Sequence, residues 1–358
     1  MATQQRLRFH WSMSAVGDDL RASRARSAQS GVPNLAAHLD FCRLAEECGI
    51  ESLLTAFGFH RPDPIALAAV LGTRTERIKF LVAVRSGVTA PTYFAQQINT
   101  LSTLIDGRVT INIVAGHSPH EQRYYGDFLE HDERYARTDE FFTICNALWR
   151  GDAPVDFSGK YYKVEGARLA TPFSAPDRAT PEIYAGGNSP LAEELSVKHA
   201  DCQLRVADSP EAMAPRVRAV RERGVDVGVI CSLISRRTRE EAVEAGYSMI
   251  ERLDSGSRKV HEDFRRRSDS VAFTSTLALA QEERSWRTPY LWTGAVPYLG
   301  APSIALVGSP DDIASALLDY RRIGVTQFLF LGWPDDAEML HFSAEILPRV
   351  RKQEASVT

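Results

Sequence analysis

Long apolar runs, paired cysteines and an excess of charge of either sign are all missing from this 358-residue chain. No apolar stretch reaches the roughly 18 residues that a membrane-spanning helix requires, so we expect no membrane association. Residues 1–9 are mostly polar and show no secretory signal, and we therefore expect a cytoplasmic protein. The five cysteines are scattered, odd in number and without C-x-x-C spacing, which argues against a disulfide framework and against a zinc site.

The charge balance is nearly even, with 42 Lys and Arg against 46 Asp and Glu. The one dense basic run, residues 265–267, is the size of an ordinary solvated face, so we expect no nucleic-acid partner. The sequence also lacks a carboxylate pair or a cluster of histidine and acidic residues with metal-ligand spacing. His117 and His120 lie three residues apart without an acidic or cysteine partner at a matching spacing. We therefore expect no metal site.

What the sequence does contain is a repeated alternation of short, branched apolar runs with segments of helical periodicity. This alternation is typical of β-α units that form a parallel sheet. Eight strands are predicted, over residues 7–11, 52–55, 78–84, 109–114, 182–185, 202–206, 227–234 and 327–331. With a helix after each strand, the count favours an α/β fold with one (β/α)8 TIM barrel over two doubly wound halves. We treat residues 1–358 as a single barrel domain with insertions.

Two connections between these strands are longer than a barrel needs. Residues 116–181 form an insertion that contains a helix around 135–149 and a hairpin of strands 155–157 and 161–163. Residues 252–303 begin with a polar run and become rich in Trp, Tyr and Pro after residue 286. Long connections in compact domains are often functional, so we expect the second one to act as a mobile lid over a site.

In a barrel, the residues that carry chemistry lie at the carboxyl ends of the strands. The candidates at these positions are His10, Trp11, residues 55–60, Arg85, Ser86, residues 116–120, residues 186–189, Ser232 and Trp333. Polar and aromatic side chains dominate this set, and acids are few.

Residues 186–189, with the sequence Gly-Gly-Asn-Ser, stand between a predicted strand and a predicted helix. Glycines allow a close approach to the backbone, and a helix N-terminus offers N–H groups and the positive end of its dipole to a phosphate. The alternative is an ordinary turn in which Ser189 caps the helix. The pattern is not G-x-G-x-x-G, so the dinucleotide fingerprint of a Rossmann fold is absent.

Residues 131–135, with the sequence His-Asp-Glu-Arg-Tyr, come just ahead of a predicted helix. They supply an imidazole, a guanidinium and a phenol within five residues, which could hold a phosphate and the polar edge of an aromatic ring. A salt-bridged helix start is the alternative.

Several strings of the chain, in their order, resemble one family. They are residues 80–89 (FLVAVRSGVT), 112–116 (NIVAG), 131–135 (HDERY), 185–189 (AGGNS), 291–294 (LWTG) and 305–308 (ALVG). Together they resemble the bacterial-luciferase-like flavin monooxygenases, in particular the alkanesulfonate monooxygenase branch. The resemblance runs from about residue 9 to residue 348, and it implies a TIM-like barrel with insertions.

The resemblance also implies a cofactor and its contacts. Such enzymes take reduced FMN from a separate flavin reductase and use it with O2 to oxidise a small organic substrate. By resemblance, the FMN-binding residues are Phe57, Ser86, His131, Tyr135, Gly186, Gly187 and Ser189. Of these, Ser189, the two glycines and Tyr135 would hold the phosphate, and the other three would contact the flavin. The protein would supply orientation and exclude water, while the flavin carries the redox chemistry.

The chain departs from the alkanesulfonate branch on the substrate side. By alignment Arg61 replaces a cysteine, Ile230 and Ser232 replace an arginine and a histidine, Trp333 replaces a catalytic tyrosine, and Leu299 lies near a lid arginine. Losing these cations argues against a simple alkanesulfonate, although Arg61, Arg85 and His10 could still hold an anion.

We place three residues, His10, Arg61 and Trp333, on the catalytic or substrate side of the pocket. For Arg61 the alternative is a surface loop charge, and for Trp333 it is a packed rim aromatic.

The leading function is therefore a two-component, FMNH2-dependent monooxygenase that acts as a homodimer or homotetramer. The alternatives are an alkanesulfonate monooxygenase proper, a deazaflavin-dependent dehydrogenase on the same barrel, or a non-catalytic flavin-binding relative.

Overall fold

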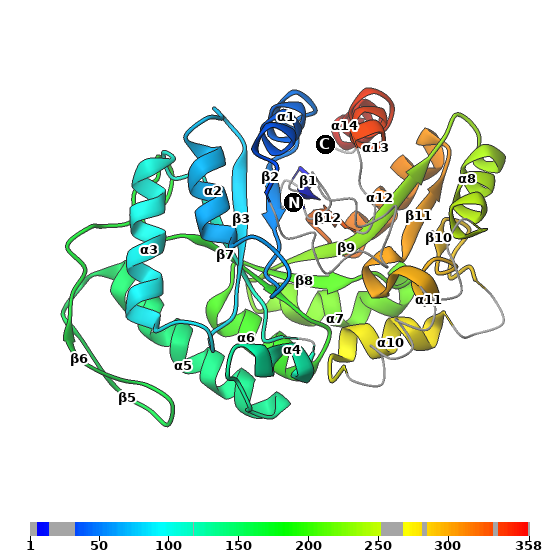
Figure 1. The fold of residues 1–358 in the computed structure, drawn as a ribbon. Helices are drawn as coiled ribbons and strands as arrows, with labels where there is room; N and C mark the ends of the chain where they lie inside the picture. Colours follow the sequence, from blue (N-terminus) through cyan, green and yellow to red (C-terminus); the bar gives the residue numbers. More distant parts are fainter. Residues whose placement is uncertain are drawn as a thin grey trace.

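Eight parallel strands close into a barrel in the computed structural model of this chain (Figure 1). The structure describes residues 6–13, 33–116, 118–251, 268–280, 285–331 and 336–356. The barrel strands are β1 (Arg8–Ser12), β2 (Ser52–Thr55), β3 (Lys79–Val84), β4 (Val109–Ile113), β7 (Glu182–Gly186), β8 (Cys202–Val206), β9 (Asp226–Ser235) and β12 (Gln327–Phe330). They pair in this order, and β9 closes the ring by pairing with both β8 and β12. The (β/α)8 barrel is confirmed, with each predicted strand matched to within one residue at either end.

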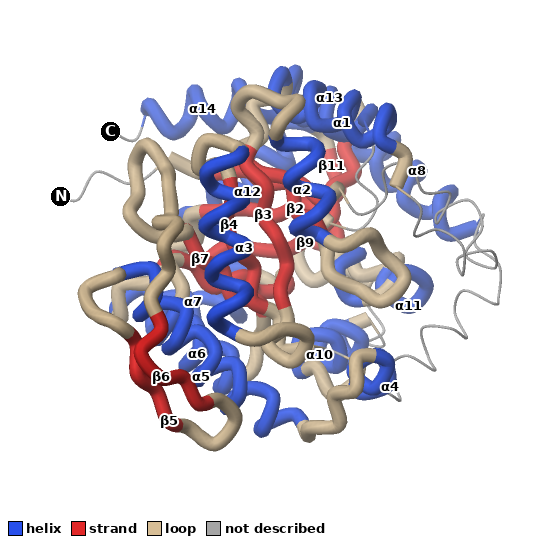
Figure 2. The backbone as a smooth tube through the Cα atoms, turned by 60° about the vertical axis from the view of Figure 1, so that its left-hand side comes forward, coloured by secondary structure: helices blue, strands red, loops and turns tan. Residues whose placement is uncertain are grey.

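Helices surround the strands on the outside of the barrel (Figure 2). Those that follow the strands are α1 (Leu35–Glu47), α2 (Pro64–Gly72), α3 (Pro91–Leu104), α5 (His131–Arg150), α6 (Pro190–His199), α7 (Pro210–Glu222), α8 (Arg239–Glu251) and α12 (Pro310–Arg322). After β12 the chain continues through α13 (Asp336–His341), the π-helical turn η4 (Phe342–Ile346) and α14 (Leu347–Ser356).

Many of these helices begin in the same way. The side chain of an Asp or Ser at the N-cap accepts a hydrogen bond from the backbone N–H three residues later in the chain, and a proline comes directly after the cap residue. The cap residues are Asp63, Ser189, Ser209 and Ser309, and Ser118 caps the short helix α4 (Pro119–Tyr124) in the same way. The capping oxygen satisfies one of the otherwise unpaired N–H groups of the first turn, and proline has no N–H to satisfy. The cap therefore fixes where each helix begins after its strand.

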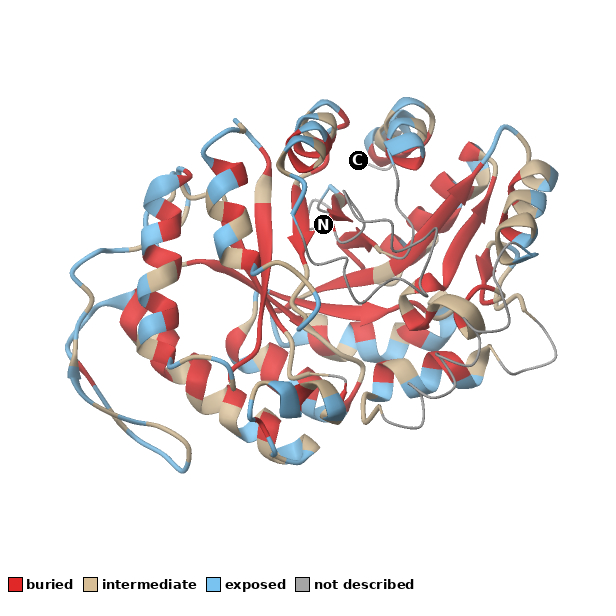
Figure 3. Cartoon of the chain, in the orientation of Figure 1, coloured by how far each residue is buried: buried red, intermediate tan, exposed pale blue. Residues whose placement is uncertain are grey.

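Alternation along the strands produces two apolar layers. On β2 and β3, Leu53, Phe80 and Val82 face the surrounding helices, whereas Leu54 and Leu81 face the barrel interior. Figure 3 shows that buried residues fill the strands and the inner faces of the helices. The strands are thus covered on both faces, as a parallel sheet requires.

The amino ends of the strands are closed by charged side chains. Arg8 Nη1 lies 2.6 Å from Glu182 Oε1, Arg8 Nε donates to Glu51 at 2.7 Å, and Lys79 Nζ lies 3.3 Å from Glu51. Burial alone would raise the pKa of Glu51, but hydrogen bonds and charge from Arg8 lower it to about 2. This network occupies the end of the barrel opposite to the one where barrel enzymes place their chemistry.

The insertion between β4 and β7 differs from its prediction in two details. Helix α5 begins at His131 and not near residue 135. The hairpin consists of β5 (Val155–Ser158) and β6 (Lys163–Ala167), so the second strand begins two residues later than expected. Glu140 of α5 explains the shift, because its carboxylate accepts the backbone N–H groups of residues 160–162 at 2.7 to 3.1 Å and holds them in a turn.

The described part of the second long connection contains regular structure that we did not predict. It holds α10 (Val271–Leu279), β10 (Leu291–Trp292), α11 (Val296–Leu299), the short 3-10 turn η3 (Ala301–Ser303) and β11 (Ala305–Gly308). β11 pairs in parallel with the second half of β9, and β10 pairs antiparallel with β11. Residues 252–267 and 281–284 of the predicted lid lie outside the described residues, and its mobility stays a prediction.

Candidate active site

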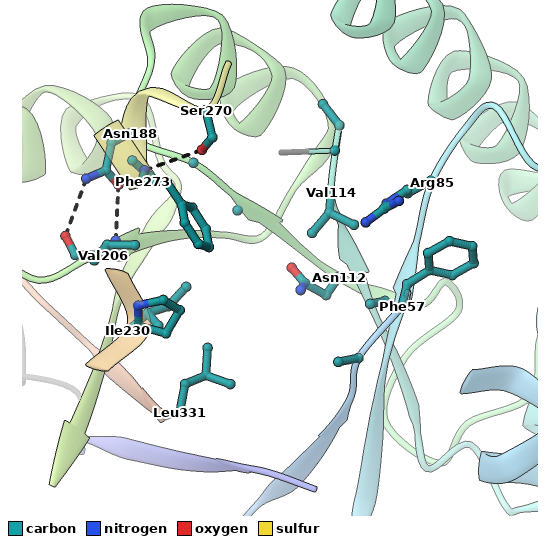
Figure 4. Close-up of a pocket in the computed structure, with 18 of the residues that line it drawn as sticks. Phe57, Arg85, Asn112, Val114, Asn188, Val206, Ile230, Ser270, Phe273 and Leu331 are labelled. Atoms are coloured by element: carbon teal, nitrogen blue, oxygen red, sulfur yellow. Dashed lines mark hydrogen bonds between the residues drawn. The ribbon is translucent and has the colours of Figure 1, made fainter. Parts of the chain in front are cut away.

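A cavity of about 430 Å3 lies at the carboxyl ends of the barrel strands (Figure 4). Its floor is apolar and comes from the inner faces of the strands and the residues that follow them: Leu54, Ala83, Ile230, Leu329 and Leu331. The volume lies within the range of about 300 to 1,000 Å3 that is common for sites of small molecules and cofactors. The position is the one that active sites occupy in barrels of this type.

One side of the cavity is the glycine turn between β7 and α6. Gly187 has φ +147°, and a Cβ added there would lie 2.6 Å from Ala192 Cβ and 3.4 Å from the Tyr135 hydroxyl. Ser189 lines the cavity while its hydroxyl accepts the N–H of Ala192 at 3.1 Å. Only glycine lets the backbone pass this closely to its neighbours, and the start of α6 offers N–H groups to an anion.

Two side chains of α5 face this turn. His131 and Tyr135 lie one helical turn apart with ring centroids 5.0 Å apart, and both line the cavity. The Tyr135 hydroxyl is hydrogen-bonded with Ser189, and burial raises the pKa of Tyr135. The phenol therefore stays neutral near pH 7 and can donate a hydrogen bond. Because α5 begins at His131, both side chains belong to the first turns of one helix and not to a preceding loop.

Polar groups of β8 hold the glycine turn from behind. Gln203 donates to the Gly187 carbonyl at 3.0 Å, and the Asn188 side chain accepts the Val206 N–H at 3.1 Å. The buried Arg205 donates to the Asn188 carbonyl at 3.4 Å and lies 3.7 Å from Glu193 of α6. These bonds fix the conformation of the turn before any ligand arrives.

The opposite side of the cavity is built from the ends of β2 and β3 and from α4 (Pro119–Tyr124). Phe57, Arg61, Arg85 and Glu121 line it. Arg85 donates to Glu121 at 2.6 Å, and its guanidinium lies 5.0 Å from the centroid of the Phe57 ring. Figure 4 places Arg85 and Phe57 across the cavity from Asn188 and Phe273.

Asn112 is a lining residue that the sequence analysis did not single out. It lies in the middle of β4, its side chain faces the cavity, and its Oδ1 is buried without a hydrogen-bond partner among the described residues. A polar residue within the apolar run of β4 is the signal that could have indicated it, because inward positions of barrel strands reach the site.

The cavity is covered by the second long connection. Ser270, Val271, Ala272 and Phe273 at the start of α10 line it, together with Leu299 and Pro302. The fully buried Arg134 of α5 donates to Asp269 at 2.6 Å and to the Ala115 carbonyl at 3.1 Å, which joins α10 to the end of β4. Arg134 and Asp269, which are 135 positions apart in the sequence, thus form one ion pair over the site.

Of the ten predicted site residues, seven line the cavity: Phe57, Arg61, His131, Tyr135, Gly186, Gly187 and Ser189. His10 does not, because it lies within the barrel, with its ring nitrogens 2.8 Å from Ser52 Oγ and 2.8 Å from Gln327 Oε1. Ser86 is buried behind the cavity wall and shares a hydrogen bond of 2.8 Å with Thr138 of α5. Trp333 lies outside the described residues.

The departures from the alkanesulfonate branch also have a structural counterpart. Ile230 and Leu299 line the cavity where that branch is expected to carry cations. Ser232 uses its hydroxyl to bond the backbone carbonyls of Pro302 and Leu331. This side of the cavity is therefore apolar.

Among the residues that the structure describes, no group of three or more His, Cys, Asp or Glu side chains is placed to hold a metal ion. The described helices include none that is long and apolar enough to cross a membrane.

The geometry defines a class of protein: a (β/α)8 barrel with a cavity at the carboxyl ends of its strands, bounded by a glycine turn at a helix N-terminus, an apolar floor and a covering helix. The chain matches the family model of luciferase-like monooxygenases over residues 8–327. It therefore belongs to the luciferase-like family of flavin-dependent monooxygenases.

Solved structures share this fold at low sequence identity. EDTA monooxygenase from Chelativorans sp. BNC1 matches with a TM-score of 0.75 and 18% identity, covering 98% of this chain and 94% of that one. Riboflavin lyase with modified FMN and riboflavin matches with a TM-score of 0.73 and 19% identity over 98% and 92% of the two chains. An F420-dependent secondary alcohol dehydrogenase matches with a TM-score of 0.65 and 17% identity over 97% and 100%.

Proposed function

We propose that this protein is the oxygenase component of a two-component monooxygenase that uses reduced FMN, delivered by a separate flavin reductase, and O2. The observation that carries the proposal is the turn of Gly186, Gly187 and Ser189 at the start of α6. The turn offers a close approach to the backbone, a helix N-terminus and the Ser189 hydroxyl, and Tyr135 of α5 adds a second hydroxyl beside it. Together these are the donors that a phosphate monoester needs.

The residues around the cavity fit FMN in size and chemistry. The Ser189 and Tyr135 hydroxyls and the turn would hold its phosphate, and His131 and Phe57 would contact the flavin ring above the apolar floor. Asn112 Oδ1, which has no hydrogen-bond partner among the described residues, would accept a hydrogen bond from an N–H of the ring system. Ser86 would act indirectly, because it bonds Thr138 on the helix that carries His131 and Tyr135.

Reduced FMN supplies the electrons for the reduction of O2, and the chain supplies position and a dry site. Phe273, Leu299 and the floor residues surround the cavity with apolar groups, and the Arg134–Asp269 ion pair holds α10 over it. Excluding water in this way protects the reaction from side reactions.

We propose a small organic substrate other than a simple alkanesulfonate. Ile230 and Leu299 stand at cavity positions where the alkanesulfonate branch is expected to have arginines, and an apolar wall offers a sulfonate no hydrogen-bond donors there. Arg61 lines the other side of the cavity, and we assign it and Trp333 to substrate contacts.

The resemblance extends to a cytoplasmic homodimer or homotetramer, and we carry both expectations as part of the proposal. Sedimentation velocity of the purified protein measures the assembly directly.

The test is an anaerobic fluorescence titration with oxidised FMN, reduced FMN and a reduced deazaflavin. We expect the tightest binding for reduced FMN, and about a tenfold weaker affinity in Ser189→Ala and in Tyr135→Phe, since each removes one hydrogen bond to a charged phosphate. Ser209→Ala is the matched control, because Ser209 caps α7 in the same Ser-Pro arrangement but does not line the cavity.

Unchanged reduced-FMN affinity in both variants would refute the phosphate assignment. Tighter binding of the deazaflavin would favour the alternative of hydride transfer, which the similarity to the F420-dependent dehydrogenase makes specific. Flavin binding without turnover on any substrate would indicate a non-catalytic relative.

A further inference from the structure

Arg85 has unused hydrogen-bonding capacity in a buried position. It follows directly after β3, and 3% of its side chain is exposed. Nη2 donates to Glu121 at 2.6 Å, but Nε and Nη1 are buried without a hydrogen-bond partner among the described residues. An unpaired buried group is costly, and for a charged group the penalty is larger. None of the residues that the structure describes satisfies these nitrogens. A ligand in the cavity that Arg85 lines would do so.

The free nitrogens belong to a side chain that faces the cavity. Arg85 lines the cavity beside Phe57, across from the glycine turn that we assign to the phosphate (Figure 4). The Phe57 ring, 5.0 Å from the guanidinium, limits how the planar group can rotate. Arg85 is thus held in place at the end of the cavity that the cofactor phosphate does not use.

The charge of this wall is positive. Among the described residues that line the cavity, the fully charged ones are Arg61, Arg85 and Glu121, which leaves one net positive charge. The Glu121 carboxylate does not serve Arg85 alone, because its second oxygen accepts the Phe59 N–H at 2.9 Å. An incoming anion would therefore meet a cation that one carboxylate neutralises only in part.

We propose that Arg85 anchors a carboxylate of the substrate, while the apolar part of the substrate lies over Phe57 and the cavity floor. The proposal rests on the proposed function, since it concerns the substrate of the same site. It places the anion on the wall of β2, β3 and α4, across the cavity from the apolar side chains of Ile230 and Leu299. A planar guanidinium suits a carboxylate, and a charged hydrogen bond is about twice as strong as a neutral one.

Calorimetric titration of the FMN-saturated protein with sodium hexanoate, sodium hexanesulfonate and hexanamide tests the proposal. The three probes share an alkyl part and differ in charge. We expect hexanoate to bind about 10- to 100-fold more tightly than hexanamide, and more tightly than hexanesulfonate. Equal binding of hexanoate and hexanamide, or tighter binding of hexanesulfonate than of hexanoate, would overturn the proposal.

Two variants assign the anion to Arg85. The double substitution R85M/E121Q removes the guanidinium together with its partner, so that no unpaired carboxylate remains to disturb folding, and it should abolish the preference for the anion. R85K keeps the charge without the planar fork and should lose part of it. Arg123→Met is the matched control, because Arg123 is an exposed arginine of the same α4 that does not line the cavity. An undiminished preference in R85M/E121Q would refute the assignment.

The outcomes separate this proposal from the proposed function. If reduced-FMN affinity falls in R85M/E121Q, Arg85 contacts the flavin, so this proposal fails while the proposed function stands. If the unsubstituted protein binds no flavin, the proposed function fails, and the same titrations on flavin-free protein still report on Arg85. Loss of anion binding in Ser189→Ala, but not in R85M/E121Q, would place the probe at the glycine turn and overturn the proposal.

Discussion

Gly186 and Gly187 offer a sharp test of the glycine turn and of the phosphate site proposed there, because the structure requires glycine at only one of these two positions. Gly187 has φ +147°, and an added Cβ would lie 2.6 Å from Ala192 Cβ in the first turn of α6. At Gly186 an added Cβ would have its nearest neighbours at 3.8 to 3.9 Å, which is ordinary van der Waals contact. Gly187→Ala and Gly186→Ala therefore make the same chemical change in two very different places.

The expected difference follows from two contributions. Forcing alanine into a conformation that favours glycine costs of order 1 to 3 kcal/mol. A methyl group packed into a filled space adds about 1 to 3 kcal/mol more, since Ala192 belongs to a capped helix and cannot move without its turn. We expect Gly187→Ala to lower the free energy of unfolding by about 2 to 6 kcal/mol. Gly186→Ala should change it by less than about 1 kcal/mol.

Urea unfolding followed by circular dichroism measures both variants against the unsubstituted protein. Reduced-FMN titration of the folded fraction gives a second readout, because a displaced turn should also lose affinity for the phosphate. Equal stability of the two variants would refute the argument that the turn is built on Gly187. A stable Gly187→Ala protein with normal reduced-FMN affinity would also remove the observation on which the proposed function rests.

Two further substitutions test the barrel interior. Glu51 has its pKa lowered to about 2 by Arg8, so the stability that this carboxylate adds is present above its ordinary pKa of 4.5 and is lost as the pH falls towards 2. The difference in the free energy of unfolding between the unsubstituted protein and Glu51→Gln should therefore shrink by up to about 3 kcal/mol between pH 6 and pH 2.5. Acid denaturation measures this difference, and curves of unfolding free energy against pH that run parallel for the two proteins would contradict it. His10→Phe leaves Ser52 and Gln327 without their partner and should lower the free energy of unfolding by about 2 to 4 kcal/mol at unchanged reduced-FMN affinity. Normal stability with lost turnover would instead return His10 to the catalytic role that its place on the first strand suggested.

The barrel could be predicted because short runs rich in branched apolar residues alternate with segments of helical period. β3 is apolar after Lys79, as expected of a strand buried on both faces, and in β4 the polar Thr110 and Asn112 alternate with Val109, Ile111 and Ile113. The strand pair β10 and β11 gives no such signal, since β10 has two residues and β11 contains an alanine and a glycine. β11 depends on its parallel pairing with the second half of the long β9, and β10 depends on its antiparallel pairing with β11. Both pairings are tertiary features. The start of α12, by contrast, carries a Ser-Pro cap with Asp312 three residues on, a signal that the sequence did contain.

The site divides in the same way. The glycine turn and the first turns of α5 are short stretches of sequence, and each brings several functional groups together locally. The ion pairs that complete the cavity join segments that are distant in the sequence. Arg85 and Glu121 are 36 positions apart, and Arg134 and Asp269 are 135 positions apart. No spacing rule links such residues, because their contact depends on how the loops cross the barrel end. His10 shows the reverse error, since a polar residue near a strand end can serve the interior of the barrel as well as its mouth.

This division bears on what the enzyme oxidises. The groups assigned to the phosphate lie in the turn between β7 and α6, which the Ser189 cap fixes, and in the first turns of α5, so the cofactor end depends little on loop sequence. The opposite end is made by side chains of the β2–α2 loop, the end of β3 and α4. In this chain, apolar residues stand at Ile230 and Leu299, and across the cavity stands a buried guanidinium whose Nε and Nη1 have no hydrogen-bond partner among the described residues. If FMN and the substrate bind as proposed, a substrate that presents its anion to Arg85 would approach the flavin from a different side than one held by cations at the positions of Ile230 and Leu299. A different atom of the substrate would then face the oxidant.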